Sequence, residues 1–261
     1  MSSLATSKQK KIPKSVKRIL IDIKNYSQNK PHNTFISICN NNVFKVKVLI
    51  IGPQDTPYAN AFFFVDLEFT NNYPFEPPKA KFKSTDGKIR FNPNLYQDGK
   101  VCLSILGTWQ GPSWSIVQTM SSVILSIQSL LGEYPLRNEP GYENCKQKED
   151  KMINYNNYVQ YHTLNFAIAD MIHKKLFPPE FEYVVKEIFI KNYDSIIKII
   201  QDNKKLHNTV AKTSYLQLSV KLDYELVEKK IVKLKEDVTN YLKNTEKFVE
   251  LDYNDNKYQV I

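Results

Sequence analysis

The spacing of apolar residues near the start of the chain predicts one amphipathic helix. Four of them recur at gaps of three, one and three and share one helical face, opposite lysines: Val16, Ile19, Leu20 and Ile23. Pro13 is tolerated in a first helical turn, and Pro31 cannot continue a helix. We therefore predict a helix that begins at Pro13 and ends near residues 25–29.

The apolar pattern then changes to an alternation of two, which is typical of β-strands. Four such segments follow, at residues 35–39, 43–50, 62–68 and 79–84. Turn sequences separate them, and the last of these, residues 73–78, holds three prolines. Proline lacks a donor N–H and biases its predecessor to extended geometry, so this stretch is neither a helix nor an interior strand. One helix followed by a four-stranded antiparallel meander predicts an α+β fold.

The second half of the chain shows a different pattern. Residues 88–114 are mostly irregular, and a long irregular stretch in a compact domain usually has a function. A strongly apolar helix is predicted at residues 117–131, crossing the sheet. The remaining chain shows no further strand pattern, and helices are predicted at residues 156–175, 180–202 and 215–247. The last has apolar residues at alternating gaps of four and three, the seam of a helix packed on a helix.

Composition narrows the class of protein. The chain has 261 residues, of which 42% are hydrophobic and 24% charged, and a formal net charge of +9. The basic residues are densest near the start, and elsewhere lysines alternate with acidic residues, so we do not expect nucleic-acid binding. No apolar run approaches the ~18–20 residues of a membrane span, and no apolar segment of a signal peptide follows the basic start. We expect neither secretion nor membrane association.

The three cysteines are Cys39, Cys102 and Cys145. Their number is odd and no two have CxxC spacing, so they form neither a disulfide framework nor a zinc site. A reducing compartment, cytosol or nucleus, fits best. A lone intracellular cysteine is most often a small buried hydrophobic residue, and the alternative is a reactive thiol.

The surroundings of Cys102 favour the reactive alternative. Pro93 and Gly99 make a rigid irregular path, so Asn94 and Cys102, eight positions apart, can face each other across a loop. A carboxamide beside a thiol can stabilise an oxyanion or hold the loop by bonding to backbone. It cannot deprotonate the thiol as a histidine would. Asn94 on its own would be ordinary turn chemistry.

Four motifs, in order and spacing, resemble the ubiquitin-conjugating enzyme family. They are Ile51-Gly52-Pro53 with Thr56-Pro57-Tyr58, then Tyr73-Pro74-Phe75-Glu76-Pro77-Pro78-Lys79, then Asn92-Pro93-Asn94 with Gly99 and Cys102, and Trp114-Ser115. Asn92 stands where the family has a structural histidine, so it does not put activity in doubt. Residues 90–112 and 138–143 further resemble the large members with a helical C-terminal extension, including the one that charges both ubiquitin and a tandem ubiquitin-like modifier.

The resemblance implies a fold and a division of the chain. We expect the family's α+β fold, in which an N-terminal helix, the meander, an active-site loop and a crossover helix precede additional C-terminal helices. Residues 1–12 would be a flexible basic tail, residues 13–160 the catalytic core, and residues 161–261 a helical extension packed on the core.

The resemblance also implies catalytic roles. Cys102 would accept the modifier's C-terminal carboxyl from an activating enzyme's thioester, and Asn94 would stabilise the oxyanion or hold the loop. No histidine is near Cys102 in sequence, so the attacking lysine must lose its proton by desolvation or to a carboxylate. Glu139, before Pro140, matches the family's acidic gate residue. The loop is one residue longer here, so Asn138 could occupy the gate and Glu139 could be a solvated loop residue.

The resemblance also implies sites for partner proteins, at the positions that match those of the family. Basic residues of the first helix would meet the activating enzyme's acidic domain, or form a solvated face: Lys14, Lys17 and Arg18. Phe75 resembles the aromatic residue that RING or HECT ligases grip. The family's Ser-Pro-Ala is Ser115-Ile116-Val117 here, so Ile116 and Val117 leave ligase choice open. Leu125 and Ser129 match positions that hold the donor modifier, although Leu125 could be a core residue.

The sequence therefore predicts a ubiquitin-conjugating enzyme that transfers ubiquitin or a related modifier from Cys102 to substrate lysine. Expected partners are the modifier, an activating enzyme, a RING or HECT ligase and protein substrates, with no nucleic acid and no membrane; the chain would be a monomer. No metal or cofactor is expected, since ATP is used by the activating enzyme. The alternative is an inactive ubiquitin-binding variant, a class that lacks the catalytic cysteine. A cysteine hydrolase would need a base on the thiol, which the sequence does not provide.

Overall fold

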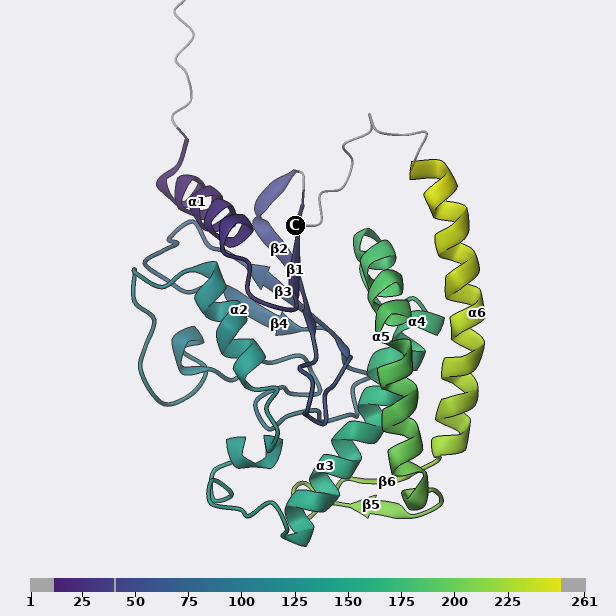
Figure 1. Cartoon of the computed structure of the whole chain (residues 1–261). Helices are drawn as coiled ribbons and strands as arrows, with labels where there is room; N and C mark the ends of the chain where they lie inside the picture. Colours follow the sequence, from purple (N-terminus) through teal and green to yellow (C-terminus); the bar gives the residue numbers. More distant parts are fainter. Residues whose placement is uncertain (1–11, 40, 250–261) are drawn as a thin grey trace, which may run out of the picture.

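A four-stranded antiparallel sheet, in the order β1-β2-β3-β4, forms the centre of the computed structural model, which describes residues 12–39 and 41–249 (Figure 1). Its strands are β1 (Thr34–Cys39), β2 (Asn42–Ile51), β3 (Phe62–Glu68) and β4 (Lys79–Phe82). Helix α1 (Lys14–Gln28) precedes the sheet and α2 (Met120–Ser129) follows the active-site segment. The predicted α+β meander is confirmed. Of the predicted tail, residues 1–11 lie outside the described ranges.

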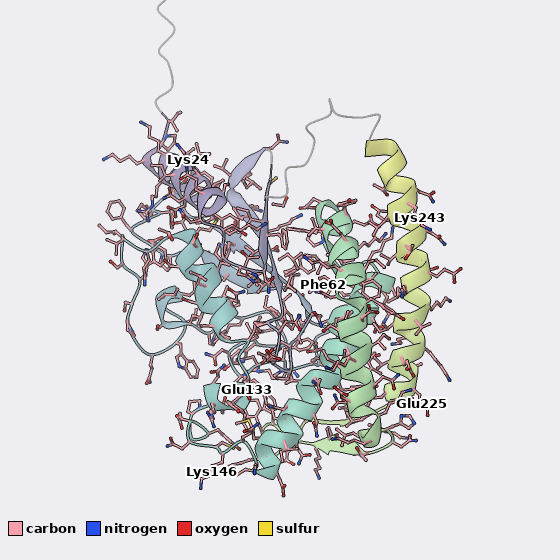
Figure 2. All side chains as sticks on the ribbon, in the orientation of Figure 1. Lys24, Phe62, Glu133, Lys146, Glu225 and Lys243 are labelled. Carbon is pink, nitrogen blue, oxygen red and sulfur yellow. The ribbon has the colours of Figure 1, made fainter. Side chains whose placement is uncertain are left out.

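The first four residues of β3 and the last four of β2 are buried on both faces of the sheet. In β3 the four residues from Phe62 to Val65 are all buried, and Phe62 lies between the sheet and the helices beside it (Figure 2). The ring of Phe63 packs against Phe91 at a centroid distance of 5.2 Å, and Phe64 packs against Phe181 at 5.4 Å. An antiparallel strand with one solvated face would alternate apolar and polar residues, so this continuous apolar run reflects cover on both sides.

The crossover helix begins three residues later than predicted because Thr119 caps it. The Thr119 hydroxyl accepts from the backbone N–H of Ser122 at 3.3 Å, and the Ser122 hydroxyl accepts from that of Thr119 at 3.1 Å. This reciprocal capping box satisfies backbone donors that the first turn leaves free, so the helix starts at Met120.

The C-terminal part is helical, as predicted. Helix α3 (Asp150–His162) continues through a π-helical stretch (Thr163–Asp170) into α4 (Met171–His173), and α5 (Glu182–Asn203) and α6 (Tyr224–Val249) follow. The predicted boundary at residue 160 thus falls inside a continuous helical run. Short 3-10 turns lie at Ser104–Leu106, Pro135–Asn138, Pro179–Phe181 and Lys204–Leu206.

The expectation of no further strand was wrong. Strands β5 (Val210–Lys212) and β6 (Ser219–Lys221) form an antiparallel hairpin before α6. Each strand has three residues, too few to show an alternating pattern. Helix α6 consequently begins at Tyr224 instead of residue 215. At this start the Asp223 carboxylate accepts a hydrogen bond from the Leu226 N–H at 2.9 Å and caps the first turn.

The extension packs directly on the sheet, and α3 and α5 lie beside it in Figure 1. Phe177 and Phe181 both face Phe64, and Lys47 of β2 forms an ion pair with Glu180 at 2.8 Å. Among the helices in the described ranges, none combines the length and apolar character needed to cross a membrane.

Candidate active site

Asn92 holds the turn that leads to the candidate nucleophile. Its side chain is fully buried and donates to the Leu130 carbonyl at 2.7 Å and to the Tyr58 hydroxyl at 3.1 Å. Its amide oxygen accepts from the backbone N–H of Asn94 at 2.9 Å. These bonds join the active-site loop to the end of α2, which is a structural role.

Asn94 and Cys102 face each other, as predicted from their spacing. The Cys102 N–H donates to the Asn94 carbonyl at 2.9 Å, and the Asn94 side-chain amide donates to the Cys102 carbonyl at 2.8 Å. The Asn94 amide oxygen is buried with no hydrogen-bond partner in the described part of the chain. Gly99 completes the loop at a φ of +91°, where a Cβ atom would lie 2.6 Å from the Phe82 carbonyl oxygen. In this state Asn94 holds the loop, the second of the two roles considered for it.

The Cys102 residue is only 1% exposed, whereas Cys39 is exposed. A buried thiol cannot be reached by the carbonyl of an incoming thioester, so loading requires neighbouring residues to move. The segment that follows this cysteine is open to solvent, since residues 107–113 are all exposed. The Cys102 side chain, by contrast, is shielded from solvent in this conformation.

Arg90 is a buried cation at this loop that sequence reasoning did not single out. Its guanidinium donates to the Pro93 carbonyl at 2.6 Å and lies 3.5 Å from the centre of the Tyr96 ring. The Tyr155 hydroxyl of α3 donates to the Arg90 carbonyl at 3.1 Å. An arginine two residues before the Asn-Pro-Asn motif, with a tyrosine just after it, was the available signal.

The two gate candidates point to different surroundings. Asn138 donates to the Asn92 amide oxygen and to the Leu130 carbonyl, both at 3.3 Å. Glu139 is partly exposed and lies beside Tyr215 of the extension. Burial raises the pKa of Tyr215 to about 12, with the Arg90 charge lowering it and the Glu139 charge raising it. The structure thus brings Asn138 to Asn92 and brings Glu139 to the extension.

The basic residues of α1 differ in exposure. Lys14 and Lys17 are exposed, while the Arg18 guanidinium is used inside the molecule. It donates to the Asp22 carboxylate at 2.9 Å, to the Ile116 carbonyl at 2.9 Å and to the Gln118 carbonyl at 2.6 Å. Arg18 therefore fastens α1 to the loop that precedes α2, and the lysines are the residues that remain available at the surface.

The predicted ligase-binding residues lie on two tied loops. Phe75 is 74% exposed, Val117 is 78% exposed, and Ile116 is exposed as well. The indole N–H of Trp114 donates to the Pro74 carbonyl at 2.7 Å, which joins the two loops. Together with the bonds from Arg18, this contact stiffens a loop that lacks the family's proline.

The residues predicted to hold the donor modifier are both on the outer side of α2. Leu125 is 50% exposed, which excludes the alternative that it is a core residue. Ser129 is exposed, and its hydroxyl donates to the Ser126 carbonyl at 2.8 Å.

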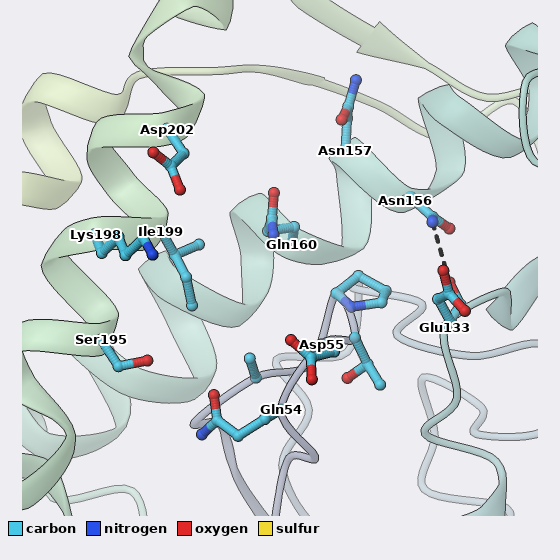
Figure 3. Close-up of a pocket in the computed structure, with 13 residues that line it drawn as sticks. Gln54, Asp55, Glu133, Asn156, Asn157, Gln160, Ser195, Lys198, Ile199 and Asp202 are labelled. Atoms are coloured by element: carbon cyan, nitrogen blue, oxygen red, sulfur yellow. Dashed lines mark hydrogen bonds between the residues drawn. The ribbon is translucent and has the colours of Figure 1, made fainter.

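A polar cleft of about 480 Å³ lies elsewhere, between the turn at residues 54–57 and helices α3 and α5. Figure 3 shows Gln54 and Asp55 below Gln160, with Lys198 and Asp202 at one side. None of the predicted site residues lines this cleft.

The sheet, the loop around Cys102 and the crossover helix together place the chain in the ubiquitin-conjugating class. A family model described as ubiquitin-conjugating enzyme matches residues 18–163, and this chain belongs to that family. The family membership that the sequence motifs predicted is confirmed.

Two groups of relatives show how far the likeness extends. Ubiquitin-conjugating enzyme E2 Z of Homo sapiens is 36% identical over 234 residues, which is 89% of this chain and 66% of that protein. E2 Z of Danio rerio is 37% identical over 210 residues, 80% of this chain and 64% of that protein. The chain thus spans slightly less than two thirds of these relatives. Human dual E2 ubiquitin-conjugating enzyme/E3 ubiquitin-protein ligase BIRC6 is 41% identical over 160 residues, 57% of this chain and 3% of that protein.

Proposed function

We propose that this chain accepts ubiquitin or a ubiquitin-like modifier as a thioester on Cys102 and transfers it to a lysine of a protein substrate. The observation that carries the proposal is the pair of reciprocal hydrogen bonds between Asn94 and Cys102, in which the Asn94 side-chain amide bonds to the main chain of the cysteine in a buried loop. Human ubiquitin-conjugating enzyme E2 Z, which is similar to this chain over 89% of its length, aligns with both the core and the extension.

The chemistry has two acyl transfers. The Cys102 thiolate attacks the carbonyl carbon of the modifier's thioester on the activating enzyme, and that enzyme's thiolate leaves. A substrate lysine then attacks the new thioester, the Cys102 thiolate leaves and an amide bond forms. The lysine must lose a proton, by desolvation or to a carboxylate such as Glu139, while Asn94 donates to the oxyanion. For that role the Asn94 amide uses its second N–H or releases the Cys102 carbonyl.

The exposed groups support a set of partners. Lys14 and Lys17 would meet the activating enzyme, with Arg18 holding the helix in place. A RING or HECT ligase would bind Phe75, Ile116 and Val117, and the donor modifier would cover Leu125 and Ser129. We propose no cofactor for the chain itself, since ATP is consumed by the activating enzyme, and we propose a monomer that acts in the cytosol or nucleus.

A charging reaction tests the proposal. The chain is incubated with activating enzyme, ATP and ubiquitin, and the products are separated with and without reductant. We expect an adduct of one ubiquitin that reductant removes and that Cys102→Ala does not form. Cys39→Ala is the matched control, because it removes the exposed thiol and leaves Cys102 intact.

The same reaction separates the alternatives. Parallel reactions with two activating enzymes and a second ubiquitin-like modifier identify the modifier class. Absence of an adduct in every combination, together with ubiquitin binding by NMR titration, would instead establish an inactive ubiquitin-binding variant.

A further inference from the structure

The Arg90 side chain contacts the active-site loop on both sides of Asn94. Its guanidinium donates to the carbonyl of Pro93, the residue directly before Asn94, at 2.6 Å. The guanidinium carbon also lies 3.5 Å from the ring centre of Tyr96, two residues after Asn94. A guanidinium donates in fixed directions and stacks on aromatic faces. One side chain therefore constrains the path of the loop through Asn94.

The Arg90 guanidinium is a buried cation without a carboxylate partner. The residue is only 5% exposed, and none of the ion pairs in the described part of the chain includes it. Burying a charge is costly, and buried charges are usually paired for that reason. The Pro93 carbonyl and the Tyr96 ring offset part of this cost, and both belong to the active-site loop.

Helix α3 holds the main chain of Arg90. The Tyr155 hydroxyl donates to the Arg90 carbonyl at 3.1 Å, and the Arg90 N–H donates to the Tyr158 hydroxyl at 3.4 Å. Both tyrosines are buried, and their rings are stacked at a centroid distance of 6.3 Å. Buried polar groups that are all bonded make a rigid network. Arg90 is thus fixed at its backbone by α3, while its side chain bonds to the loop that holds Asn94.

The peptide bond between Pro93 and Asn94 is held at both of its polar atoms. Its carbonyl oxygen accepts from the Arg90 guanidinium, and its N–H donates to the Asn92 amide oxygen at 2.9 Å. A peptide unit is planar, so two bonds on opposite sides fix its orientation. Pro93 has no N–H, so its carbonyl is the only backbone group through which the protein can hold it. Loss of Arg90 would leave this peptide held on one side.

We infer that Arg90 is a positioning residue for the transfer step: by holding the peptide bond before Asn94, it directs the Asn94 amide toward the thioester on Cys102. The inference rests on the proposed function. Arg90 acts through Asn94 and not on the modifier or the lysine. Its loss should therefore slow attack by lysine and leave loading of Cys102 unchanged, as is expected for loss of the Asn94 amide itself.

Single-turnover discharge tests this inference. The chain is charged with ubiquitin, charging is stopped by removing ATP, and loss of the thioester is followed at several concentrations of free lysine. Arg90→Met keeps a long side chain and removes both the donor and the charge. We expect charging to be unchanged and the maximal discharge rate to fall roughly tenfold, the effect of one lost hydrogen bond from a charged group. The lysine concentration at half-maximal rate should not change. A maximal rate equal to that of the unmodified chain would overturn the inference.

Arg90→Lys is the conservative variant. Lysine keeps the charge and can donate to the Pro93 carbonyl, but it lacks the planar group that stacks on Tyr96. Its discharge rate should lie between that of Arg90→Met and that of the unmodified chain. No recovery relative to Arg90→Met would overturn the role of the bond to Pro93.

Arg137→Met is the matched control. The Arg137 guanidinium also donates to a backbone carbonyl, that of Cys145 at 3.0 Å, and lies 4.3 Å from the centre of the Tyr134 ring. The contacts are of the same two kinds, but they lie outside the turn at residues 92–94. Discharge should match that of the unmodified chain. Equal slowing by Arg90→Met and Arg137→Met would overturn the inference, because it would indicate a general effect of losing a surface or loop contact.

A double-mutant cycle supplies a readout that a purely structural role would not affect. In an Asn94→Ala background, Arg90→Met should have little further effect on discharge, since its influence passes through Asn94. Additive losses would overturn the proposed route.

A milder pair of substitutions decides the question if thermal unfolding shows that Arg90→Met does not fold. Tyr155→Phe removes only the hydroxyl that holds the Arg90 carbonyl, and it should slow discharge by about threefold. Tyr224→Phe removes a buried hydroxyl that has no hydrogen-bond partner within residues 12–39 and 41–249, so it should not slow discharge. Equal rates for these two variants would overturn the inference. If the unmodified chain forms no thioester, the proposed function fails; if it charges normally and only the Arg90 and Tyr155 predictions fail, the proposed function stands.

Discussion

The active-site loop and the C-terminal extension are held by different interactions. Around Cys102 three buried side chains are polar, and these residues, Arg90, Asn92 and Asn94, each bond to a backbone carbonyl. The extension is joined to the sheet mainly by aromatic rings, such as Phe181 on Phe64. Directional bonds fix geometry and lose it when one atom is removed, whereas apolar contacts contribute stability in proportion to buried area. Substitutions in the loop should therefore change rates, and substitutions in the extension should change stability.

The largest effect is expected on the free energy of unfolding, after a substitution where the extension packs on the sheet. Phe181→Ala removes a fully buried ring between β3 and α5, so it should lower the free energy of unfolding by about 3–5 kcal/mol. Urea unfolding followed by circular dichroism measures the change. Phe75→Ala is the matched control, since Phe75 is exposed and its loss should change stability by about 0.5 kcal/mol or less. A small loss at Phe181 would show that the extension is not a stable part of the core.

The next largest effect is expected on the rate of thioester discharge, after a substitution in the active-site loop. Asn94→Ala should still form the thioester, but its discharge to free lysine should slow by about 10²–10³-fold, the usual cost of losing an oxyanion donor. Discharge after ATP removal measures the rate, and thermal unfolding shows whether the loop is retained. Asn71→Ala, a change at an exposed asparagine, should leave both unaffected. Normal discharge by Asn94→Ala would mean that the amide only holds the loop.

The same contrast explains what the sequence could predict. Most strands and helices followed their periodicity, whereas β3 is buried on both faces and departs from simple alternation. The Asn94–Cys102 pairing followed from a short spacing within one loop. The β5–β6 hairpin was missed because three-residue strands carry no period. The contact of the Tyr215 ring with Tyr155, whose hydroxyl bonds to the Arg90 carbonyl, could not be predicted, since it depends on how the extension packs on the core. Contacts within one loop could be predicted from the sequence, whereas contacts between the core and the extension could not.

The smallest effect is expected at a residue that takes part neither in the polar bonds of the active-site loop nor in the aromatic contacts of the extension. Lys17 is exposed on α1, so Lys17→Glu should leave folding and lysine discharge unchanged. It should slow charging by the activating enzyme several-fold at low ionic strength, because exposed complementary charges act mainly on the association rate. At about 1 M salt the Debye length falls to roughly 3 Å, and the difference should disappear. Initial charging rates over a salt series measure this.

Two comparisons decide whether the effect belongs to the α1 surface. Lys148→Glu makes the same charge change at an exposed position before α3, so it should not slow charging. Arg18 would be a misleading probe, because its guanidinium also holds the Ile116 and Gln118 carbonyls and its loss would disturb the ligase-facing loop. If Lys17→Glu and Lys148→Glu slow charging equally, net charge and not the α1 surface governs encounter with the activating enzyme.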